Sequence, residues 1–142
     1  MEDKKIIYED DIVVVKYWQE KKIIENKWKK QSILDEESYR KPFLEAINFS
    51  KKNDVYYFIS DIRQEGIVSH KEKKWFKEYT IPTALEHNIK LAAIITNYNI
   101  FKTYYINALI KLGNNMNFRI KMFNKYSKAL RWIDSYKNNL NN

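Results

Sequence analysis

The chain has 142 residues and a formal net charge of +8, from 26 Lys and Arg residues against 18 Asp and Glu residues. This length fits one compact domain with its own hydrophobic core. The chain has no cysteine, which excludes disulfides, thiolate nucleophiles and thiolate metal sites. The start at Met1 is charged, unlike a signal peptide, and the longest apolar run, Leu91 to Ile95, is far shorter than the roughly 20 residues that span a bilayer. We therefore expect a cytoplasmic protein with no membrane span.

The positive charge raises the question of nucleic-acid binding, because lysine and arginine neutralise phosphates. Only four of the basic residues are arginine, whereas planar bidentate recognition of phosphates and bases favours arginine. The excess of Lys, Asn, Ile and Tyr is also what AT-rich codons produce. We therefore predict no specific nucleic-acid site, only weak attraction to polyanions.

In chain order, the first elements are three strands. Lys4–Tyr8 and Ile12–Trp18 are rich in β-branched and aromatic residues and are separated by a polar turn at residues 9–11. Lys22–Lys29 follows after a second polar turn. The short connections predict an antiparallel meander.

A helix is predicted next, beginning at Asp35 or Ser38 and ending near Lys51. Pro42 fits the first turn if Ser38 is the N-cap. If Asp35 is the cap, Pro42 falls in the interior and bends the helix. The inner side of the helix is expected to carry Phe43, Leu44, Ile47 and Phe49.

Strands then alternate with helices. The predicted strands are short and almost continuously apolar, as expected when both faces of a sheet are covered: Val55–Ser60, Leu91–Thr96 and Phe118–Phe123. The helix after the first of them opens with a capping-box pattern, Ser69-His-Lys-Glu72, in which Ser69 accepts from the Glu72 amide. This helix carries Trp75, Phe76 and Tyr79 and must kink or restart at Pro82.

Two further helices complete the chain. One begins near Ile100 and is predicted to end with Gly113 at the C′ position. The other covers Lys125–Tyr136. The predicted apolar stripes are Ile100, Phe101, Tyr104, Tyr105, Ala108, Leu109 and Leu112 on the first helix, and Ala129, Leu130 and Ile133 on the second.

The order βββαβαβαβα predicts a single α/β domain over residues 1–137, followed by a polar tail at residues 138–142. Its mixed sheet has about six strands, an N-terminal antiparallel meander followed by parallel βαβ units with right-handed crossovers, and it is covered by four main helices.

In open α/β sheets, ligands collect outside the carboxyl ends of the parallel strands. The sequence places three strand exits at that edge: Asp61 with the loop to Ser69 and His70, then Thr96-Asn97-Tyr98, and then Asn124-Lys125. We expect a binding site there, although no motif marks it.

Each candidate residue at these exits also has a structural interpretation. Asp61 is a candidate general base, cation ligand or partner of a phosphorylated group, but as a turn residue it would cap loop amides. Ser69 is a candidate for phosphorylation at a helix N-terminus, where the common role of serine is the N-cap. His70 is a candidate proton shuttle, or simply a solvated first-turn histidine.

The sequence predicts no cofactor and no metal site. Its two histidines, His70 and His87, lack HxxxH or HExxH spacing, and His87 is explained by its place near a helix C-terminus. No GxSxG motif is present, and two glycines cannot build a phosphate-binding loop. No feature favours a Ser–His–carboxylate triad, which would have to assemble in space.

Aromatic residues are plentiful, with Trp75 beside Phe76 and Tyr104 beside Tyr105. These pairs are candidates for lining an apolar ligand cavity, or they are ordinary core. Neighbours on a helix point about 100° apart, so one member of each pair is directed to the helix flank, which is compatible with a homodimer surface.

The chain resembles the STAS domains (anti-sigma-factor antagonists), and more closely their SpoIIAA-like branch. The residues that carry the resemblance are YYFISDIRQEGIVSHKEKKWF, LAAIIT and FNKYSKALRWI, and the match covers roughly Ile12 to Tyr136. It implies a four-helix, mixed-sheet fold, no intrinsic catalysis, and binding of a protein partner or a small, lipid-like molecule.

The regulatory STAS members carry a phosphorylatable serine in an Asp-Ser-Ser-Gly type turn at the start of the second helix. Here Asp61 is followed by Ile62-Arg63-Gln64-Glu65-Gly66, and the serine comes only at Ser69. The contiguous motif is absent, which argues against a phosphorylation switch and a sigma-factor pathway.

The sequence thus favours a non-enzymatic STAS-like binding or regulatory domain that engages a protein partner through the strand-end rim. The residues expected to contribute are Asp61, Ser69, His70, Thr96, Asn97, Tyr98 and Trp75. The first alternative is a carrier of a small apolar or lipid-like ligand. The second is a hydrolase-type enzyme that uses Asp61 and His70.

Overall fold

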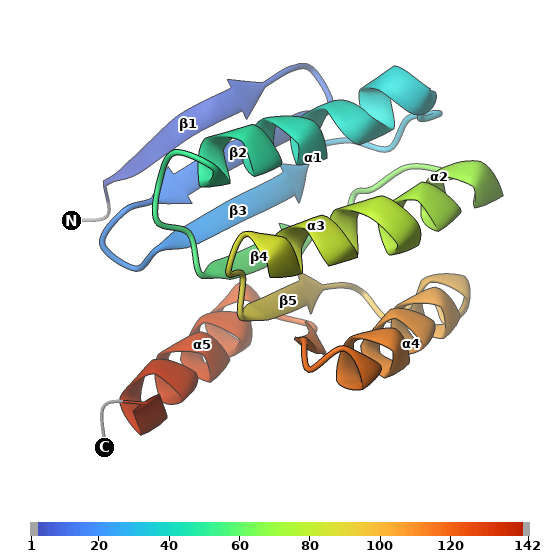
Figure 1. Cartoon of the computed structure of the whole chain (residues 1–142). Coiled ribbons are helices and arrows are strands. Elements are labelled where there is room, and N and C mark those ends of the chain that lie inside the picture. The colour runs from blue at the N-terminus through green and yellow to red at the C-terminus, as the bar shows by residue number, and fades with distance from the viewer. Residues whose placement is uncertain (1–2, 141–142) are drawn as a thin grey trace.

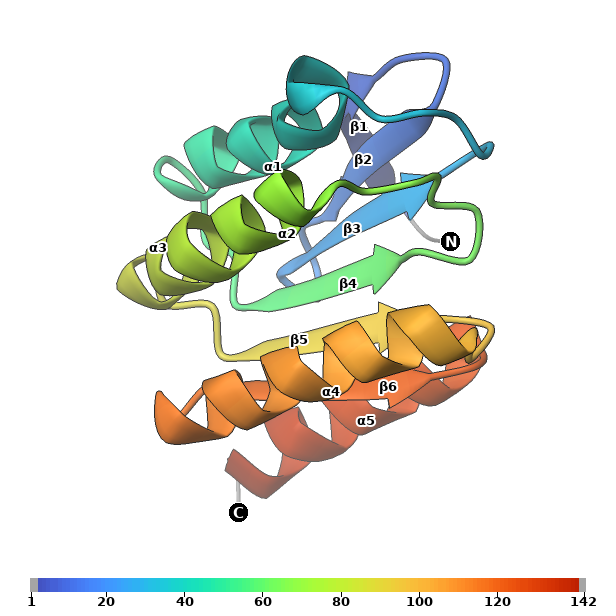
Figure 2. The ribbon, with the colours of Figure 1, turned by 90° about the vertical axis from the view of Figure 1, so that its right-hand side faces the viewer.

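The predicted mixed sheet is confirmed by the computed structural model, which describes residues 3–140 apart from the side chain of Phe101. Six strands lie side by side in the order in which they occur in the chain. Figure 1 labels β1 to β5, and Figure 2 also labels β6. They are β1 (Lys4–Glu9), β2 (Val13–Trp18), β3 (Ile23–Trp28), β4 (Tyr57–Asp61), β5 (Leu91–Ile95) and β6 (Arg119–Phe123).

The pairing of the strands follows the lengths of their connections. β1, β2 and β3 are joined by short turns and pair antiparallel, with an irregularity in β1 between Ile6 and Tyr8. β3, β4, β5 and β6 are joined through helices and pair parallel. Because parallel neighbours require a long crossover, this change of pairing matches the change from turns to helices in the sequence.

The four predicted helices are also present. They are α1 (Glu36–Ser50), the continuous segment α2 (His70–Trp75), η1 (Phe76–Thr80) and α3 (Ile81–Glu86), then α4 (Ile100–Asn115) and α5 (Tyr126–Leu140). Within the predicted polar tail, α5 continues to Leu140, and residues 141–142 lie outside the described residues.

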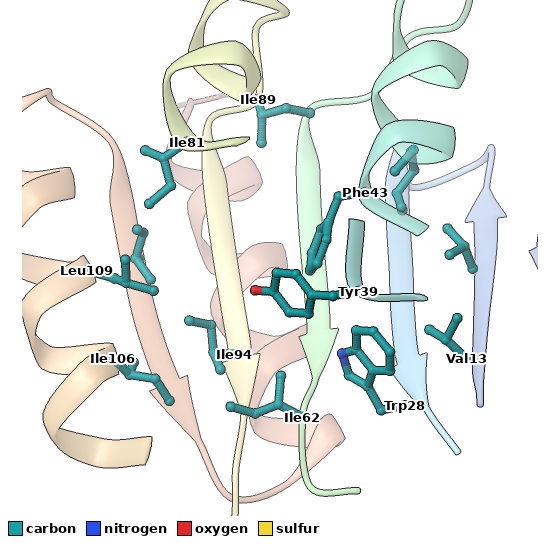
Figure 3. Close-up of a cluster of buried hydrophobic side chains, with 14 of the residues drawn as sticks. Val13, Trp28, Tyr39, Phe43, Ile62, Ile81, Ile89, Ile94, Ile106 and Leu109 are labelled. Carbon is teal, nitrogen blue, oxygen red and sulfur yellow. The ribbon is translucent and has the colours of Figure 1, made fainter. Parts of the chain in front are cut away.

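The helices cover the two faces of the sheet unequally. Figure 2 shows α1, the α2–α3 segment and α4 on one face and α5 on the other. The larger core cluster lies under the three helices, and ten of its residues are labelled in Figure 3. The smaller cluster packs α5, through Ala129 and Ile133, against β4 and β5. Crossovers of the same hand between sequential strands place their helices on the same face, which explains why three helical segments lie together.

Polar groups also hold α5 to its face of the sheet. The Lys4 ammonium lies 3.0 Å from a Glu25 carboxylate oxygen and donates to the Tyr126 hydroxyl at 3.0 Å. The Tyr126 hydroxyl in turn donates to Glu25. This network joins β1, β3 and α5, which come from both ends of the chain.

The N-cap of α1 is Asp35, whose carboxylate accepts from the Ser38 amide at 2.8 Å. Pro42 therefore lies inside the helix, the second of the two placements that the sequence allowed. The inner face is rotated slightly from the predicted one, because Tyr39 and Ala46 are buried while Leu44 is 38% exposed. Phe43 and Ile47 are buried as expected.

The helix that contains Pro82 neither breaks nor ends, but widens into a π-turn. The Ile81 amide donates to the Phe76 carbonyl five residues earlier, in place of the usual partner four residues earlier. Proline lacks an amide hydrogen and clashes with the carbonyl four residues before it, so a wider turn relieves the conflict. The predicted irregularity at Pro82 thus takes the form of η1.

The prediction that Gly113 ends its helix is wrong. α4 continues to Asn115, and the left-handed residue that follows is Asn117, with φ of 59°. Gly113 is buried because β6 approaches it closely: a Cβ there would lie 2.5 Å from the Phe118 carbonyl oxygen. The need for close contact, and not for left-handed backbone, selects glycine at this position.

The predicted stripe of α4 is partly wrong for the same reason. Ile100, Tyr104 and Ala108 are exposed, whereas Ile106, which the stripe omitted, is almost completely buried. Leu109 is buried as predicted, and the side chain of Phe101 lies outside the described residues. The close approach at Gly113 fixes the rotation of the helix on its side of the sheet.

Gly66 is the second glycine required by close contact. The loop between β4 and α2, residues 62–69, runs back beside the segment after β3, where Ile67 forms an isolated parallel bridge with Ile33. The Ile67 amide donates to the Ser32 carbonyl at 3.3 Å. A Cβ on Gly66 would lie 1.8 Å from that carbonyl oxygen, so no side chain fits.

We therefore expect Gly66→Ala to destabilise the domain by about 1–3 kcal/mol, because the added methyl group forces the loop away from Ser32. Urea unfolding followed by tryptophan fluorescence measures the change. Gln64→Ala, at an exposed position of the same loop, is the control and should leave the midpoint unchanged. Equal midpoints for Gly66→Ala and the unmodified protein would show that the loop does not depend on this contact.

Candidate functional site

Asp61 and Thr96 lie side by side at the carboxyl edge of the sheet, as predicted. Asp61 at the end of β4 is in register with Ile95 of β5, next to Thr96. Thr96 is fully buried, and its hydroxyl accepts from the Tyr98 amide at 3.3 Å. Asn97 and Tyr98 are exposed, and Tyr98 has a positive φ of 58°, which is uncommon for a residue with a side chain.

The Asp61 carboxylate stabilises its own turn. It accepts from the Arg63 amide at 3.1 Å and from the Arg63 guanidinium at 3.0 and 2.8 Å. Asp61 is two residues after Ile59, so both side chains lie on the face of the sheet that packs against α5. The arrangement is that of a turn residue that caps a loop amide, the structural interpretation of this aspartate.

Ser69, His70 and Trp75 belong to a different segment, α2 and its N-cap, which packs beside α1. The Ser69 hydroxyl accepts from the Glu72 amide at 3.2 Å, so it is the predicted N-cap, and His70 is exposed in the first turn. The buried Glu72 carboxylate pairs with Arg40 of α1 at 2.6 Å. Within residues 3–140, no hydrogen bond or ion pair joins Ser69 or His70 to Asp61 or Thr96.

Trp75 contributes to the packing between α1 and α2. Its ring lies 6.2 Å from that of Tyr39 and is stacked on Tyr79 at 5.4 Å, with the Arg40 guanidinium 4.9 Å from it. It is not among the residues that line the cavity described next, whereas its neighbour Phe76 is. The predicted aromatic pairs therefore divide as expected, one ring inward and one toward the flank. Tyr105 likewise faces the cavity while Tyr104 is 82% exposed.

A cavity of about 410 Å³ lies between the sheet and the three helices on its larger face. Its floor is formed by β3 to β6 and its roof by α1, the α2–α3 segment and α4. Most of its lining is apolar, including Ile24, Phe43, Ile47, Phe58, Ile62, Phe76, Ile81, Ile89, Ile94, Ile106, Leu109, Phe118 and Ile120.

Small side chains and the π-turn leave this space open. Ala92 on the floor and Ala46 and Ala84 in the roof all line the cavity, where larger residues would fill it. Phe76, Thr80 and Ile81 of the widened helix line it as well. Phe58 and Ala92 belong to central strands, yet both are partly exposed, because the space above them is accessible.

Polar side chains line the cavity near the carboxyl edge of the strands. Ser60 of β4 and Tyr39 of α1 contribute hydroxyl groups. Figure 3 shows the ring of Tyr39 lying across β4 with its hydroxyl directed toward Ile94, another lining residue. Next to Ser60 on the same side of the sheet is the buried amide of Asn26, whose two polar atoms have no hydrogen-bond partner among residues 3–140.

Three charged residues complete this polar end: Glu65, Lys73 and Lys102. The Lys102 ammonium donates to the carbonyl oxygens of Ile62 and Glu65 at 2.9 and 3.1 Å, and so holds the loop after β4 against α4. The Lys73 ammonium lies 5.2 Å from the centre of the Tyr105 ring, and the Tyr105 hydroxyl donates to the Lys73 carbonyl at 3.1 Å.

The Glu65 carboxyl is in an unusual electrostatic position. Burial raises its pKa from 4.5 to about 7, although the Lys102 and Lys73 ammoniums oppose the shift. Burial also lowers the pKa of Lys102. Both shifts have the same cause: the cavity is poor in water, so charged groups are less stable in it than in solution.

The sequence predicted a site at the strand ends and gave Phe76 and Tyr105 as candidates for lining a cavity, but it did not identify the other cavity residues. Glu65 and Lys102 lie within a few residues of the predicted exits, yet they belong to no motif, and lysine is too common here to stand out. The available signals were indirect. They are the alanines at 46, 84 and 92 within otherwise bulky elements, and Pro82 within a helix that continues past it.

Large apolar side chains are exposed on the loops at the carboxyl edge and in the first turns of α4. Ile33, Ile67, Ile100 and Tyr104 are between 74% and 85% exposed, and Tyr98 is 49% exposed. We call these five residues the rim patch. The Ile33–Ile67 bridge and the contacts of Lys102 with Ile62 and Glu65 show that their three segments are neighbours. Figure 2 shows these loops emerging at the same edge of the sheet.

Within residues 3–140, no helix is both long and apolar enough to cross a membrane. The same residues contain no cluster of three or more His, Cys, Asp or Glu side chains suited to a metal ion.

Comparison with known proteins finds a similar solved structure. No protein-family model and no curated protein matches the chain. The solved structure is described as an uncharacterized protein from the DUF3478 family with a SpoIIAA-like fold, from Shewanella loihica PV-4. It is 20% identical, covers 92% of each chain and has a TM-score of 0.49. Its description agrees with the SpoIIAA-like resemblance of the sequence, while the fold described above rests on strand order and helix placement.

The raised pKa of Glu65 predicts that the unfolding free energy depends on pH. The folded protein binds a proton at Glu65 more tightly than the unfolded chain does, so its stabilising effect is complete below about pH 4.5 and is lost as the pH rises through about 7. We expect the unfolding free energy of the unmodified protein to fall by about 1–3 kcal/mol across this range relative to Glu65→Gln.

Urea unfolding at several pH values between 4 and 8 measures this difference (the range brackets the ordinary and raised values). Subtracting the curve of Glu65→Gln removes the contribution of the other titrating groups. Parallel pH dependence in the two proteins would mean that Glu65 titrates as an ordinary exposed carboxyl.

Proposed function

We propose that this chain is a non-enzymatic, STAS-like binding domain that holds a small apolar molecule in the cavity between its sheet and α1, α2–α3 and α4. The observation that carries the proposal is the cavity itself, about 410 Å³ and lined largely by apolar side chains. Small-molecule sites are commonly about 300–1,000 Å³, mostly apolar, with a few polar groups that orient the ligand. The aromatic and aliphatic lining and the single polar end follow that pattern.

The placement of the candidate catalytic residues supports a binding role. Asp61 is engaged by Arg63, and His70 is exposed on a different element. A hydrolase that used them as acid and base would need both within hydrogen-bond reach of one substrate. The hydrolase alternative remains a prediction, and hydrolase activity above that of a His70→Ala variant would support it.

The cavity proposal predicts that Ala92→Phe abolishes binding of an apolar probe, because the added ring occupies the space above β5. Titration with the fluorescent probe 1-anilinonaphthalene-8-sulfonate measures this binding. Native mass spectrometry of the purified protein measures any small molecule retained from the expression host.

The matched control is Ala108→Phe, which makes the same change at an exposed position of α4. We expect the control to bind the probe like the unmodified protein, with a dissociation constant at least about tenfold lower than that of Ala92→Phe. Equal binding by all three proteins would place the probe on the surface and contradict a cavity site.

A second candidate function is binding of a protein partner at the carboxyl edge, which the rim patch favours. Contiguous exposed apolar side chains on a soluble domain commonly mark interaction sites. Asp61, Ser69, His70, Trp75 and the segment Thr96–Tyr98 are the residues that the sequence proposed for such a surface. A second copy of the chain is one such partner, since a symmetric dimer buries the same patch on both subunits.

The rim patch predicts that Ile67→Asn and Ile100→Asn each remove one defined partner from a pull-down, or convert a dimer to a monomer in size-exclusion chromatography. Ile6→Asn is the control, since Ile6 is 52% exposed on β1, away from the patch. A partner set and oligomeric state that are the same in all three variants would contradict this second function.

A further inference from the structure

The cavity has two chemically different ends. Each helix over it begins near the carboxyl edge of the parallel strands and ends near their amino edge, so position along a helix gives position along the cavity. Tyr39, Lys73 and Lys102 belong to the first halves of their helical segments and lie at the carboxyl end with Ser60 and Glu65. Ile47, Ala84 and Leu109 belong to the second halves.

The amino end is the apolar end. Its two polar residues are Ser50, whose hydroxyl donates to the Ile47 carbonyl at 2.8 Å, and Thr80 in the π-turn, whose buried hydroxyl has no partner among residues 3–140. Ile89 and Phe118, which precede β5 and β6, close this end together with Leu109. A hydrocarbon chain fits here, because each buried methylene group contributes about 0.8 kcal/mol of transfer free energy.

The polar end has more positive than negative charge. The ammoniums of Lys73 and Lys102 and the single carboxyl of Glu65 line this end of the cavity, together with Tyr39 of α1 and Tyr105 of α4. Lys102 donates two of its three hydrogens to loop carbonyls, so one hydrogen remains for a ligand. Lys73 is held against the Tyr105 ring, an uncharged neighbour.

We propose that the ligand is a single-chain amphiphile with a monoanionic headgroup, such as a fatty acid, whose carboxylate lies between Lys73 and Lys102 while its chain extends toward Leu109. This inference rests on the proposed function, because it specifies the ligand of the same cavity. The volume of about 410 Å³ is at the lower end of the range for small-molecule sites, which suits one chain.

The charges at the polar end decide between the possible headgroups. With one carboxyl beside two ammoniums, a ligand carboxylate supplies the second negative charge, and charge-assisted hydrogen bonds are the stronger ones. A neutral alcohol is left with hydrogen bonds to the Tyr39 and Ser60 hydroxyls. A cationic headgroup gains Glu65 but is repelled by both lysines.

The test compares three probes with the same twelve-carbon chain and different headgroups: laurate, 1-dodecanol and dodecylammonium. Their dissociation constants are measured at neutral pH by displacement of 1-anilinonaphthalene-8-sulfonate from the unmodified protein. We expect laurate to bind about 10–100-fold more tightly than dodecanol, as one or two charge-assisted hydrogen bonds allow, and dodecylammonium to bind most weakly.

Lysine variants test whether the preference for laurate over dodecanol comes from the polar end of the cavity. Lys73→Met should weaken laurate by about tenfold and leave dodecanol unchanged. Lys102→Met should do the same, and comparison with Lys73→Met separates loss of charge from loosening of the loop that Lys102 holds. Lys74→Met, exposed next to Lys73 and outside the cavity, is the control and should change neither.

The outcomes separate this inference from the function on which it rests. If laurate and dodecanol bind equally well and both are lost in Ala92→Phe, the cavity binds apolar chains but the anionic headgroup is wrong. If dodecylammonium binds more tightly than laurate, the proposed anionic headgroup is also wrong. If none of the three probes binds, or if Ala92→Phe binds them normally, the cavity function itself is wrong.

Discussion

The constraint on which this structure depends is the sequential order of its four parallel strands. Each of β3, β4 and β5 is followed by a crossover to its immediate neighbour, and all three crossovers advance in the same direction across the sheet. With one handedness, they must all lie on the same face. The result is three helical segments side by side over four strands, with α5 alone on the other face. The asymmetry of the molecule, and the position of its cavity, follow from this topology.

Three adjacent helical segments do not by themselves leave a cavity, because side chains normally fill such a layer to the density of a molecular crystal. The space remains open because of particular residues in the sheet and the helices. Ala46, Ala84 and Ala92 have small side chains that leave part of the layer unfilled, and Phe76 and Thr80 line the cavity from the wide turn before Pro82. The same face also leaves polar atoms of Asn26 and Thr80 without partners among the described residues. Unfilled volume and unsatisfied polar groups both reduce stability, and both are expected where binding takes precedence over stability.

Much of the fold follows from the sequence, because its signals are local and strong. The polar turns, the apolar strands and the caps at Asp35 and Ser69 fix the elements, and the change from turns to helices fixes the change in strand direction. Sequence patterns do not predict the rotation of α4, that is, which of its faces is buried. Ile100 and Tyr104 fit an apolar stripe but are exposed, because the close approach of Phe118 to Gly113 sets how the helix lies. That approach joins segments whose relative position depends on the whole sheet.

The candidate site is likewise only partly predictable from the sequence. The order of strands and helices in the sequence is enough to place Asp61 beside Thr96 at one edge of the sheet, since register determines that pair. It does not reveal that Asp61 lies on the α5 face and pairs with Arg63. Nor does it reveal Glu65 and Lys102, which converge from a loop and from α4. Such residues carry no pattern in sequence, because only the packing of α4 against the loop brings them together.

The loop after β4 connects the two candidate sites. Glu65, Ile67 and Val68 all line the cavity, and Ile67 is also exposed on the rim patch and bridges to Ile33. Lys102 holds this loop through the carbonyls of Ile62 and Glu65, and the same ammonium lines the polar end of the cavity. The same ammonium thus joins the polar end of the cavity to the loop that carries Ile67, so the headgroup proposed above would meet the group that positions this loop.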